Sequence, residues 1–219
     1  MTAPAMVLTV EWACAHGSGR VPTYVKGDEL PTGVAMRDAR EQLFDAAERV
    51  LLRDGPEALT SRAVTTEAGC AKGVLHKHFT DFDGFLAELV LDRIRRLDDQ
   101  AQVLRNAVGQ GTVVDNLTTM LTDLFGSVAV AIVSLTISRD GLRARLRDAV
   151  PTGVPILTDA GRIILDYLTA EQDRGRIRAD ADLNSLGLTL IGSAHLLFAD
   201  RTGVRPTTDE VRAFVASVV

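Results

Sequence analysis

The sequence predicts an all-α fold, and three observations carry that prediction. Apolar residues recur at intervals of three and four along most of the chain after residue 36, which is the spacing of one face of an α-helix. Glycine and proline separate these apolar stretches at positions where helices end. No segment alternates apolar and polar residues between hairpin turns, as β-strands do. A chain of 219 residues that is 46% hydrophobic can bury the core that such helices require.

The first 36 residues lack this periodicity. Three prolines interrupt them, and we expect an irregular arm over residues 1–36. The apolar stretch Ala5–Val10 has no positive charge before it, so a signal peptide is not expected. A second interpretation is that translation begins at Met36, directly before the first helical pattern.

Composition narrows the class of protein. The net charge of −5 argues against a general nucleic-acid coat protein, although a local basic face remains compatible with it. Two cysteines, Cys14 and Cys70, are too few for a disulfide framework and favour a reducing compartment. The longest apolar run, Val128–Ile137, is too short to cross a bilayer. We therefore expect a cytoplasmic protein without a membrane partner.

The first two helices have clear boundaries. The first covers residues 37–54 and ends at a Gly-Pro pair, a common helix stop. A second, short helix starts at an N-cap formed by Thr60 or Ser61 and is closed by Gly69. The inward stripe of the first helix consists of Leu43, Ala46, Ala47, Val50 and Leu51.

A third short helix is expected over residues 71–79, where Leu75 and Phe79 face inward. Thr80-Asp81 then caps a longer fourth helix. Two short helices joined by a tight turn that contains glycine form a helix-turn-helix. The sequence thus predicts this motif between the first and the fourth helix.

The second half is also predicted to be helical. A helix over residues 113–128 continues into a stretch that is apolar on all sides, which suggests a central buried helix. A short basic helix is stopped by Pro151, and an amphipathic helix is ended by Gly175. Two further helices, over residues 181–201 and 207–219, complete the chain.

Segment 60–79 is locally cationic in an acidic protein. It carries Arg62, Lys72 and Lys77 against a single acid, Glu67. On the third helix, lysine and histidine side chains share the outer face beside a bare glycine, which permits close approach to a polyanion. Such a helix fits the major groove of B-DNA, where lysine reads guanine edges and flanking groups hold phosphates.

Other types of site are less well supported by this stretch. His76 and His78 are two positions apart and point in different directions on a helix, so a metal site is not expected. Cys70 is interpreted as a small buried hydrophobe and not as a redox switch. The segment Gly69–Gly73 lacks the spacing of a nucleotide phosphate loop. His195 is interpreted as a hydrogen-bonded core histidine, so we expect no catalytic residue and no cofactor.

Polar groups in the second half of the chain can be explained without a functional site. The arginines of the short basic helix are expected on a solvated helix face, the alternative being a second anion site. Several hydroxyls could bond a ligand or their own helix backbone. These two sets are Arg143, Arg145 and Arg147, and Thr119, Thr122, Ser134 and Thr136.

Residues 37–95 resemble the TetR/AcrR family of transcriptional repressors. The resemblance rests on Leu59, Thr60, Val64, Ala68, Gly69, Gly73, Leu75, His78, Phe79, Phe85 and Leu86 at their offsets. Residues 174–182 are similar to the connector that precedes the last two helices of the family. The resemblance implies an irregular arm over 1–36, a helix-turn-helix DNA-binding domain over 37–97, and a helical ligand-binding and dimerisation domain over 98–219.

The resemblance also implies a function. A homodimer would place two recognition helices about 34 Å apart on a palindromic double-stranded DNA operator. A small, largely apolar effector would release it. The expected DNA-contacting residues are Thr60, Ser61, Arg62, Ala71, Lys72, Gly73, Val74, His76, Lys77 and His78, although His78 also suits a structural role beside Leu75. The expected dimer interface comprises Leu186, Leu190, Leu197, Val211, Phe214, Val215 and Val218.

Three residues depart from the family pattern. His76 replaces a tyrosine, and Phe82 replaces a lysine that often opens the fourth helix. Asp83 adds a negative charge where a phosphate could approach the N-terminus of that helix. These departures predict weaker contacts with the DNA backbone. They leave open an alternative, a helical small-molecule-binding dimer that has lost operator binding.

Overall fold

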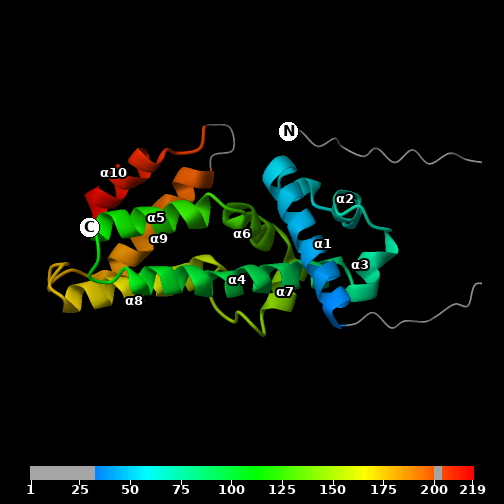
Figure 1. Cartoon of the computed structure of the whole chain (residues 1–219), viewed down its shortest axis with the longest axis horizontal. Coiled ribbons are helices and arrows are strands. Elements are labelled where there is room, and N and C mark those ends of the chain that lie inside the picture. Colours follow the sequence, from blue (N-terminus) through cyan, green and yellow to red (C-terminus); the bar gives the residue numbers. More distant parts are fainter. Residues whose placement is uncertain (1–32, 200–203) are drawn as a thin grey trace, which may run out of the picture.

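The computed structural model describes residues 33–199 and 204–219, with side chains from residue 39 onward. Within these ranges the chain forms helices and connecting loops and no strand, which confirms the predicted all-α class (Figure 1). The helices are α1 Gly33–Asp54, α2 Ser61–Glu67, α3 Gly73–His78, α4 Phe82–Asn106, α5 Val113–Phe125, α6 Ala129–Ser138, α7 Asp140–Leu146, α8 Leu157–Asp173, α9 Leu183–Ala199 and α10 Thr208–Val218. A single 3₁₀ turn covers Pro56–Ala58.

The N-terminal unit consists of α1, α2, α3 and the start of α4, which gather at one end of the molecule (Figure 1). Helix α1 starts at Gly33, so residues 33–36, expected in the irregular arm, are helical; residues 1–32 of that arm lie outside the described ranges. The predicted stop is confirmed at Gly55, whose φ of 84° is accessible to glycine at little cost.

An aromatic cluster forms the centre of this unit. The rings of Phe44 on α1, Phe79 after α3 and Phe85 on α4 lie 5.0 to 5.8 Å apart between centroids. Leu75 and Val64 are fully buried beside them. This packing holds α3 by its inner face and leaves its outer face free.

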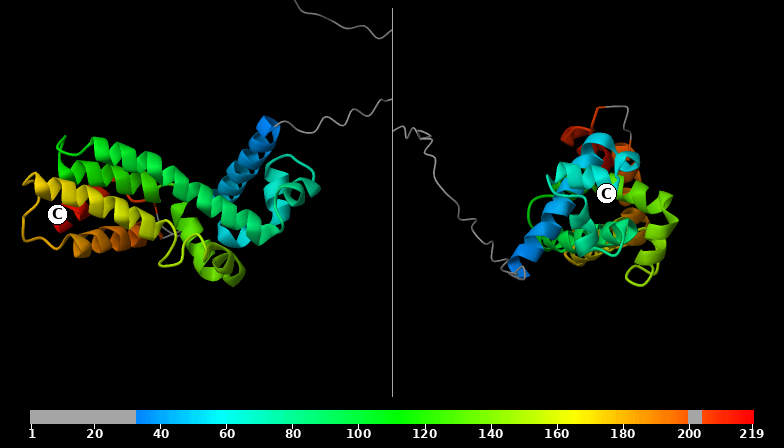
Figure 2. Two further views of the ribbon diagram at one scale, coloured as in Figure 1. Left: turned by 90° about the horizontal axis from the view of Figure 1, so that it is seen from below. Right: turned by 90° about the vertical axis from the view of Figure 1, so that its right-hand side faces the viewer.

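Helix α4 passes without a break from the first unit into the second (Figure 2). Its first turns pack in the aromatic cluster, and its later buried residues, Leu97, Ala101 and Leu104, belong to the core of the second unit. The boundary expected at residue 97 therefore lies inside one continuous helix. The two units therefore share one helix.

The second unit packs α4 to α10 around an aliphatic core (Figures 1 and 2). Helix α10 lies along α5, and α8 pairs with α9. The core includes Leu117, Leu121, Leu124, Ile132, Leu135, Leu142, Leu146, Ile164, Leu168, Leu190, Val211 and Val215. It is continuous with the core of the first unit.

The prediction of a central buried helix after residue 128 is wrong about its direction and position. The chain bends by 55° between α5 and α6, where Gly126 and Ser127 interrupt the helix. Helix α6 buries Ile132 and Leu135 but leaves 56% of Ile137 exposed, and it contacts α1 as well as α5. It therefore lies between the two units and not at the centre of either. Within the described ranges no single helix has both the length and the apolar content to span a membrane, and α5 with α6 reach that length only across the bend.

Candidate nucleic-acid interface

The turn between α2 and α3 is built by local hydrogen bonding. Thr60 caps α2 and its hydroxyl oxygen accepts a hydrogen bond from the Ala63 amide at 3.1 Å, which decides between the two predicted N-caps. Gly69 adopts a φ of 65° and turns the chain toward α3. Cys70 is half-buried against the core with a free thiol, in line with the small-hydrophobe interpretation.

The cations of this motif lack protein partners. Arg62, Lys72 and Lys77 are exposed, and none forms an ion pair with any side chain in the described ranges. Glu67, the one acid nearby, is instead bound by Arg49 at 2.7 Å and Arg53 at 2.9 Å. Hydrogen bonds from these arginines hold the pKa of Glu67 below its usual range. The acid is neutralised from α1, so the positive charge on the motif is uncompensated.

The outer face of α3 is open. Of the ten predicted contact residues, those that the structure exposes are Thr60, Arg62, Ala71, Lys72, Gly73, His76 and Lys77. A Cβ built on Gly73 would meet nothing within 4 Å. The glycine is therefore not required by packing within the described chain, and it leaves the backbone accessible to a partner.

Three predicted residues lie partly inside. Val74 is half-buried, as is Ser61, whose hydroxyl oxygen is enclosed without a hydrogen-bond partner among the described residues. His78 is also half-buried, and its carbonyl accepts a hydrogen bond from Arg40 at 3.4 Å. This arrangement agrees with the structural role considered for His78.

The start of α4 is engaged by arginines from the second unit. Asp81 caps α4 by accepting from the Gly84 amide at 2.8 Å, and it pairs with Arg145 of α7. Asp83 accepts from Arg139 at 2.7 Å, and the same guanidinium lies 5.6 Å from the centroid of the Phe82 ring. Phe82 and Asp83, which depart from the family pattern, therefore both contact Arg139 within the chain.

This contact corrects one interpretation of the arginine-rich segment. Arg145 does not lie on a merely solvated face, because it reaches the cap of α4. Arg143 bonds Asp140 at 3.0 Å and the Ile137 carbonyl at 2.9 Å, so it stays within its own segment. Sequence reasoning missed Arg139, since its partner is 56 positions away and no local pattern joins them.

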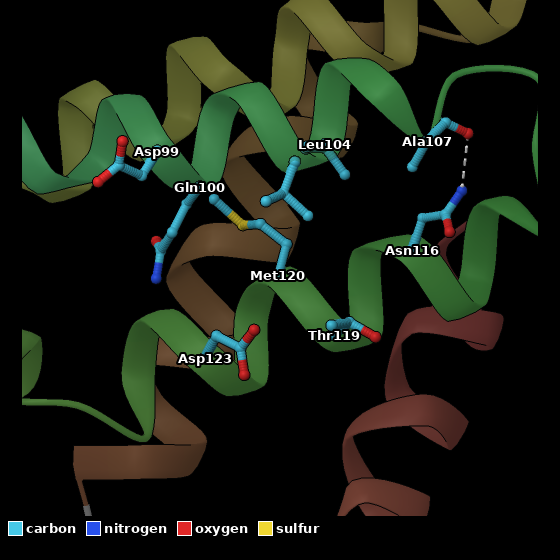
Figure 3. A pocket seen from close by; sticks show the side chains of 9 residues that line it. Asp99, Gln100, Leu104, Ala107, Asn116, Thr119, Met120 and Asp123 are labelled. Carbon is cyan, nitrogen blue, oxygen red and sulfur yellow. Dashed lines mark hydrogen bonds between the residues drawn. The ribbon is translucent and has the colours of Figure 1, made fainter.

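A cavity of about 230 Å³ lies between α4 and α5 (Figure 3). Leu104 and Met120 extend into it from facing helices and are 3% and 5% exposed. Of the hydroxyls considered as ligand contacts, Thr119 lines this cavity. Ser134 and Thr136 bond carbonyls of their own helix at 3.1 and 2.9 Å, which is the backbone alternative.

The expected dimer interface needs revision. Leu190, Val211 and Val215 are fully buried within the protomer and cannot meet a partner without unfolding it. The other four expected residues are half-buried. Leu188 and Leu196, which were not among the expected residues, are 76% and 75% exposed and lie two turns apart on one face of α9.

His195 on α9 differs from its expected role. Its ring centroid lies 5.8 Å from that of Phe125, and burial lowers the pKa of the imidazole. Its Nδ1 atom is enclosed without a hydrogen-bond partner among the described residues. Within the described ranges the ring packs against Phe125, and Nδ1 lacks the hydrogen bond that was predicted for this histidine.

Comparison with known proteins places this architecture in a family. Residues 43–89 match the family model described as bacterial regulatory proteins, tetR family. The HTH-type nicotine-responsive transcriptional repressor HdnoR of Paenarthrobacter nicotinovorans is 35% identical over 60 residues. That match covers 27% of this chain and 31% of the repressor, so the chain spans about a third of the length of this relative.

Solved structures extend the likeness of fold to most of the chain. A TetR-family transcriptional regulator from Mesorhizobium loti superposes with a TM-score of 0.63 at 16% identity, over 84% of this chain and 94% of that one. One from Rhodococcus sp. gives 0.61 at 20% identity, over 83% and 96%. The fatty acid degradation regulator FadR from Bacillus halodurans gives 0.60 at 16% identity, over 82% and 93%.

The family model covers the segment that forms α2, α3 and the aromatic cluster, which is the segment that carried the resemblance in the sequence. The solved members share the arrangement of the helices that follow. Residues 43–89 thus match the tetR family of bacterial regulatory proteins in sequence, and most of the chain shares the fold of solved TetR-family regulators.

Proposed function

We propose that this protein is a ligand-responsive DNA-binding repressor that acts as a homodimer on a palindromic operator. The observation that carries the proposal is the outer face of α2 and α3, where Arg62, Lys72 and Lys77 are exposed without ion-pair partners in the described ranges. Uncompensated cations on a projecting helix are the electrostatic footprint of a DNA-binding surface. The proposal contains no enzymatic step.

Within this surface, α3 is the reading helix. Lys72 and Lys77 are placed to reach base edges in the major groove, and Gly73 lets the backbone approach. Thr60 caps α2 through its oxygen lone pair, so its O–H stays available for a phosphate. His76 and Arg62 are the other phosphate contacts. Val74 is half-buried and contributes one apolar edge.

The dimer forms through α9 together with α10. Leu188 and Leu196 expose a continuous apolar face whose intervening turn carries Gly192, where an added Cβ would meet nothing within 4 Å. A small residue between two leucines allows two helices to pack closely. Pairing this face with its copy would set the two reading helices for successive major grooves.

The effector acts through α4. One part of this helix lines the cavity, and its N-terminal end forms the ion pairs of Asp81 and Asp83 near the proposed DNA surface. Gln100, Leu104 and the other cavity residues of α4 lie on the same continuous helix as Asp81 and Asp83. A small, largely apolar effector that fills the cavity favours one position of α4. If that position changes the spacing of the two α3 reading helices, the affinity for DNA falls. The factor by which it falls measures the coupling between the effector site and the DNA site.

The alternative of a dimer that has lost operator binding rested on Phe82 and Asp83. Both contact Arg139, and the charge of Asp83 is balanced within the protein. Neither residue therefore supports the loss of DNA binding.

Fluorescence anisotropy tests the proposal, with duplex from the intergenic region upstream of the gene and a scrambled duplex of equal length. We expect tight binding to the first and weak binding to the second. Affinity should fall steeply with salt, because phosphate contacts release counterions. Binding to both duplexes that is weak and independent of salt would contradict the proposed function.

A further inference from the structure

The cavity between α4 and α5 carries negative charge without a matching positive group. Its wall consists of Asp99, Gln100, Val103, Leu104, Ala107, Asn116, Thr119, Met120 and Asp123 (Figure 3). This set contains two carboxylates and no lysine or arginine. Both aspartates are exposed at the rim, at the end of the cavity where α5 finishes.

Among the described residues, these two carboxylates lack the ion pairs that Asp92 and Asp115 form on the same helices. Asp92 of α4 is paired with Arg95 at 2.9 Å, and Asp115 of α5 is paired with Arg212 of α10. Asp99 and Asp123 have no such arginine within the part of the chain that the structure describes. Within the described ranges, the rim of this cavity thus carries one unpaired carboxylate from each of two adjacent helices, which are available to a cation from outside.

Among the remaining polar atoms of the cavity, one acceptor lacks a partner in the part of the chain that the structure describes. The Oε1 atom of Gln100 is enclosed and has no hydrogen-bond partner among the described residues. The amide nitrogen of Asn116 is already bonded to the Ala107 carbonyl at 3.2 Å, the Gln110 carbonyl at 3.0 Å and the Tyr167 hydroxyl at 2.9 Å. A ligand that donates a hydrogen bond can satisfy the Gln100 oxygen, whereas a ligand that only accepts cannot.

The C-terminal end of α5 also favours a cation in the cavity. Asp123 lies in the last turn of α5, where unpaired carbonyl groups carry partial negative charge. A cation beside Asp123 interacts favourably with that helix end, whereas an anion is repelled by it. The charge of the cavity and the helix terminus next to it therefore act in the same direction.

The floor of the cavity is apolar. Leu104 and Met120 are almost fully buried, and Val103 at the mouth is 66% exposed. A volume of about 230 Å³ is below the roughly 300–1,000 Å³ typical of sites for drug-sized ligands. The cavity suits a compact molecule with one charged end and an apolar ring or short chain.

We infer that the effector of this protein is a compact organic cation, an amine whose ammonium group lies between Asp99 and Asp123 and whose apolar body covers Leu104 and Met120. Its regulatory consequence rests on the proposed function, whereas the binding itself does not. By pairing with carboxylates on two adjacent helices, the cation draws α4 and α5 together. The far end of α4 carries Asp81 and Asp83 into the DNA-binding unit.

Isothermal titration calorimetry on the full chain tests the inference with three probes of similar shape. Phenethylamine is the cation, 2-phenylethanol is its neutral counterpart and 3-phenylpropanoate is the anion. We expect the amine to bind roughly tenfold more tightly than the alcohol, as two partly exposed ion pairs provide, and the carboxylate to bind most weakly. Equal affinity for amine and alcohol, preference for the carboxylate, or no detectable binding of the amine overturns the inference.

Charge-neutralising variants locate the site. Asp99→Asn and Asp123→Asn should each lower the affinity for phenethylamine by about three- to fivefold and leave that for 2-phenylethanol unchanged. Asp98→Asn is the matched control, since Asp98 is exposed on the same helix but does not line the cavity. If Asp98→Asn weakens amine binding as much as the other two, the site lies elsewhere and the inference fails.

DNA release, measured separately, distinguishes this inference from the proposed function. If the protein binds its operator and the anion or the alcohol displaces it better than the amine, the inference fails while the proposed function stands. If the protein binds no DNA but still selects the amine through Asp99 and Asp123, the proposed function fails while the ligand site stands.

Discussion

The guanidinium of Arg139 bonds the carboxylate of Asp83 at 2.7 Å and lies over the ring of Phe82. Arg139 stands at the junction of α6 and α7 in the second unit, while Asp83 and Phe82 open α4 in the N-terminal unit. One arginine thus accounts for both unusual residues at the start of α4. It also makes the position of α7 part of the electrostatics near the proposed DNA surface.

Arg139→Ala should weaken DNA binding severalfold, because it restores an uncompensated negative charge next to the proposed phosphate contacts. The double variant Arg139→Ala/Asp83→Asn should recover part of that loss, and anisotropy at fixed salt measures both. Arg143→Ala is the control, since Arg143 bonds only its own segment. Unchanged affinity in Arg139→Ala would disprove the electrostatic role given to Asp83.

Lys72→Ala and Arg62→Ala should separate base reading from phosphate contact. Loss of Lys72 should cost about 1–3 kcal/mol on the preferred operator and relax the sequence preference. Loss of Arg62 should weaken binding to every duplex alike and reduce the salt slope by about one per contact. Parallel titrations on operator and scrambled DNA measure both effects. If the two variants behave alike on every duplex, Lys72 does not read bases.

The ion pairs of Glu67 should give stability a specific pH dependence. The folded-state pKa of Glu67 is lowered, chiefly by hydrogen bonds from Arg49 and Arg53, so its contribution is fully present above the unfolded-state pKa near 4.5. It is lost as pH falls through the lower folded-state value. Urea denaturation should therefore show Glu67→Gln as less stable than wild type at neutral pH, with the gap closing in acid. A gap that is independent of pH would mean that Glu67 acts through packing and not through charge.

Leu188→Glu together with Leu196→Glu should convert the proposed dimer into folded monomers. Both side chains are about three-quarters exposed within the protomer, so the substitution leaves its core intact. Sedimentation velocity should show a lower mass, and circular dichroism should show unchanged helix content. Leu52→Glu on α1 is a control for charge on an exposed leucine outside α9. A double variant that remains dimeric would place the interface on another face.

The helices of this chain were predictable because their signals are local. Thr60, Gly69 and Asp81 mark ends by their own capping or backbone preferences, and the structure confirms each. The bend after Phe125 was not predicted, because an unbroken apolar run conceals a change of direction that weak helix formers at Gly126 and Ser127 allow.

The parts of the site that depend on distant residues could not be read from the sequence. The pairing of Arg139 with Asp83 and of Arg49 with Glu67 requires the tertiary fold, as does the placement of Asp99 and Asp123 at one cavity. Leu188 and Leu190 are equally apolar in the sequence, yet one is exposed and the other buried. The rotation of α9 that decides between them is fixed by its packing against α8 and α5.

Gly73→Ala tests the central claim most directly, because it separates the fold from the DNA surface. An added methyl group at this position meets nothing within 4 Å, and alanine favours a helix over glycine, so the free energy of unfolding should stay equal or rise slightly. Gly161→Ala, at an equally open position on α8, is the matched control. If α3 lies in the major groove, Gly73→Ala should bind the operator at least about tenfold more weakly, the cost of one poorly accommodated contact, while Gly161→Ala binds normally. Wild-type affinity in Gly73→Ala would contradict the assignment of α3 as the reading helix.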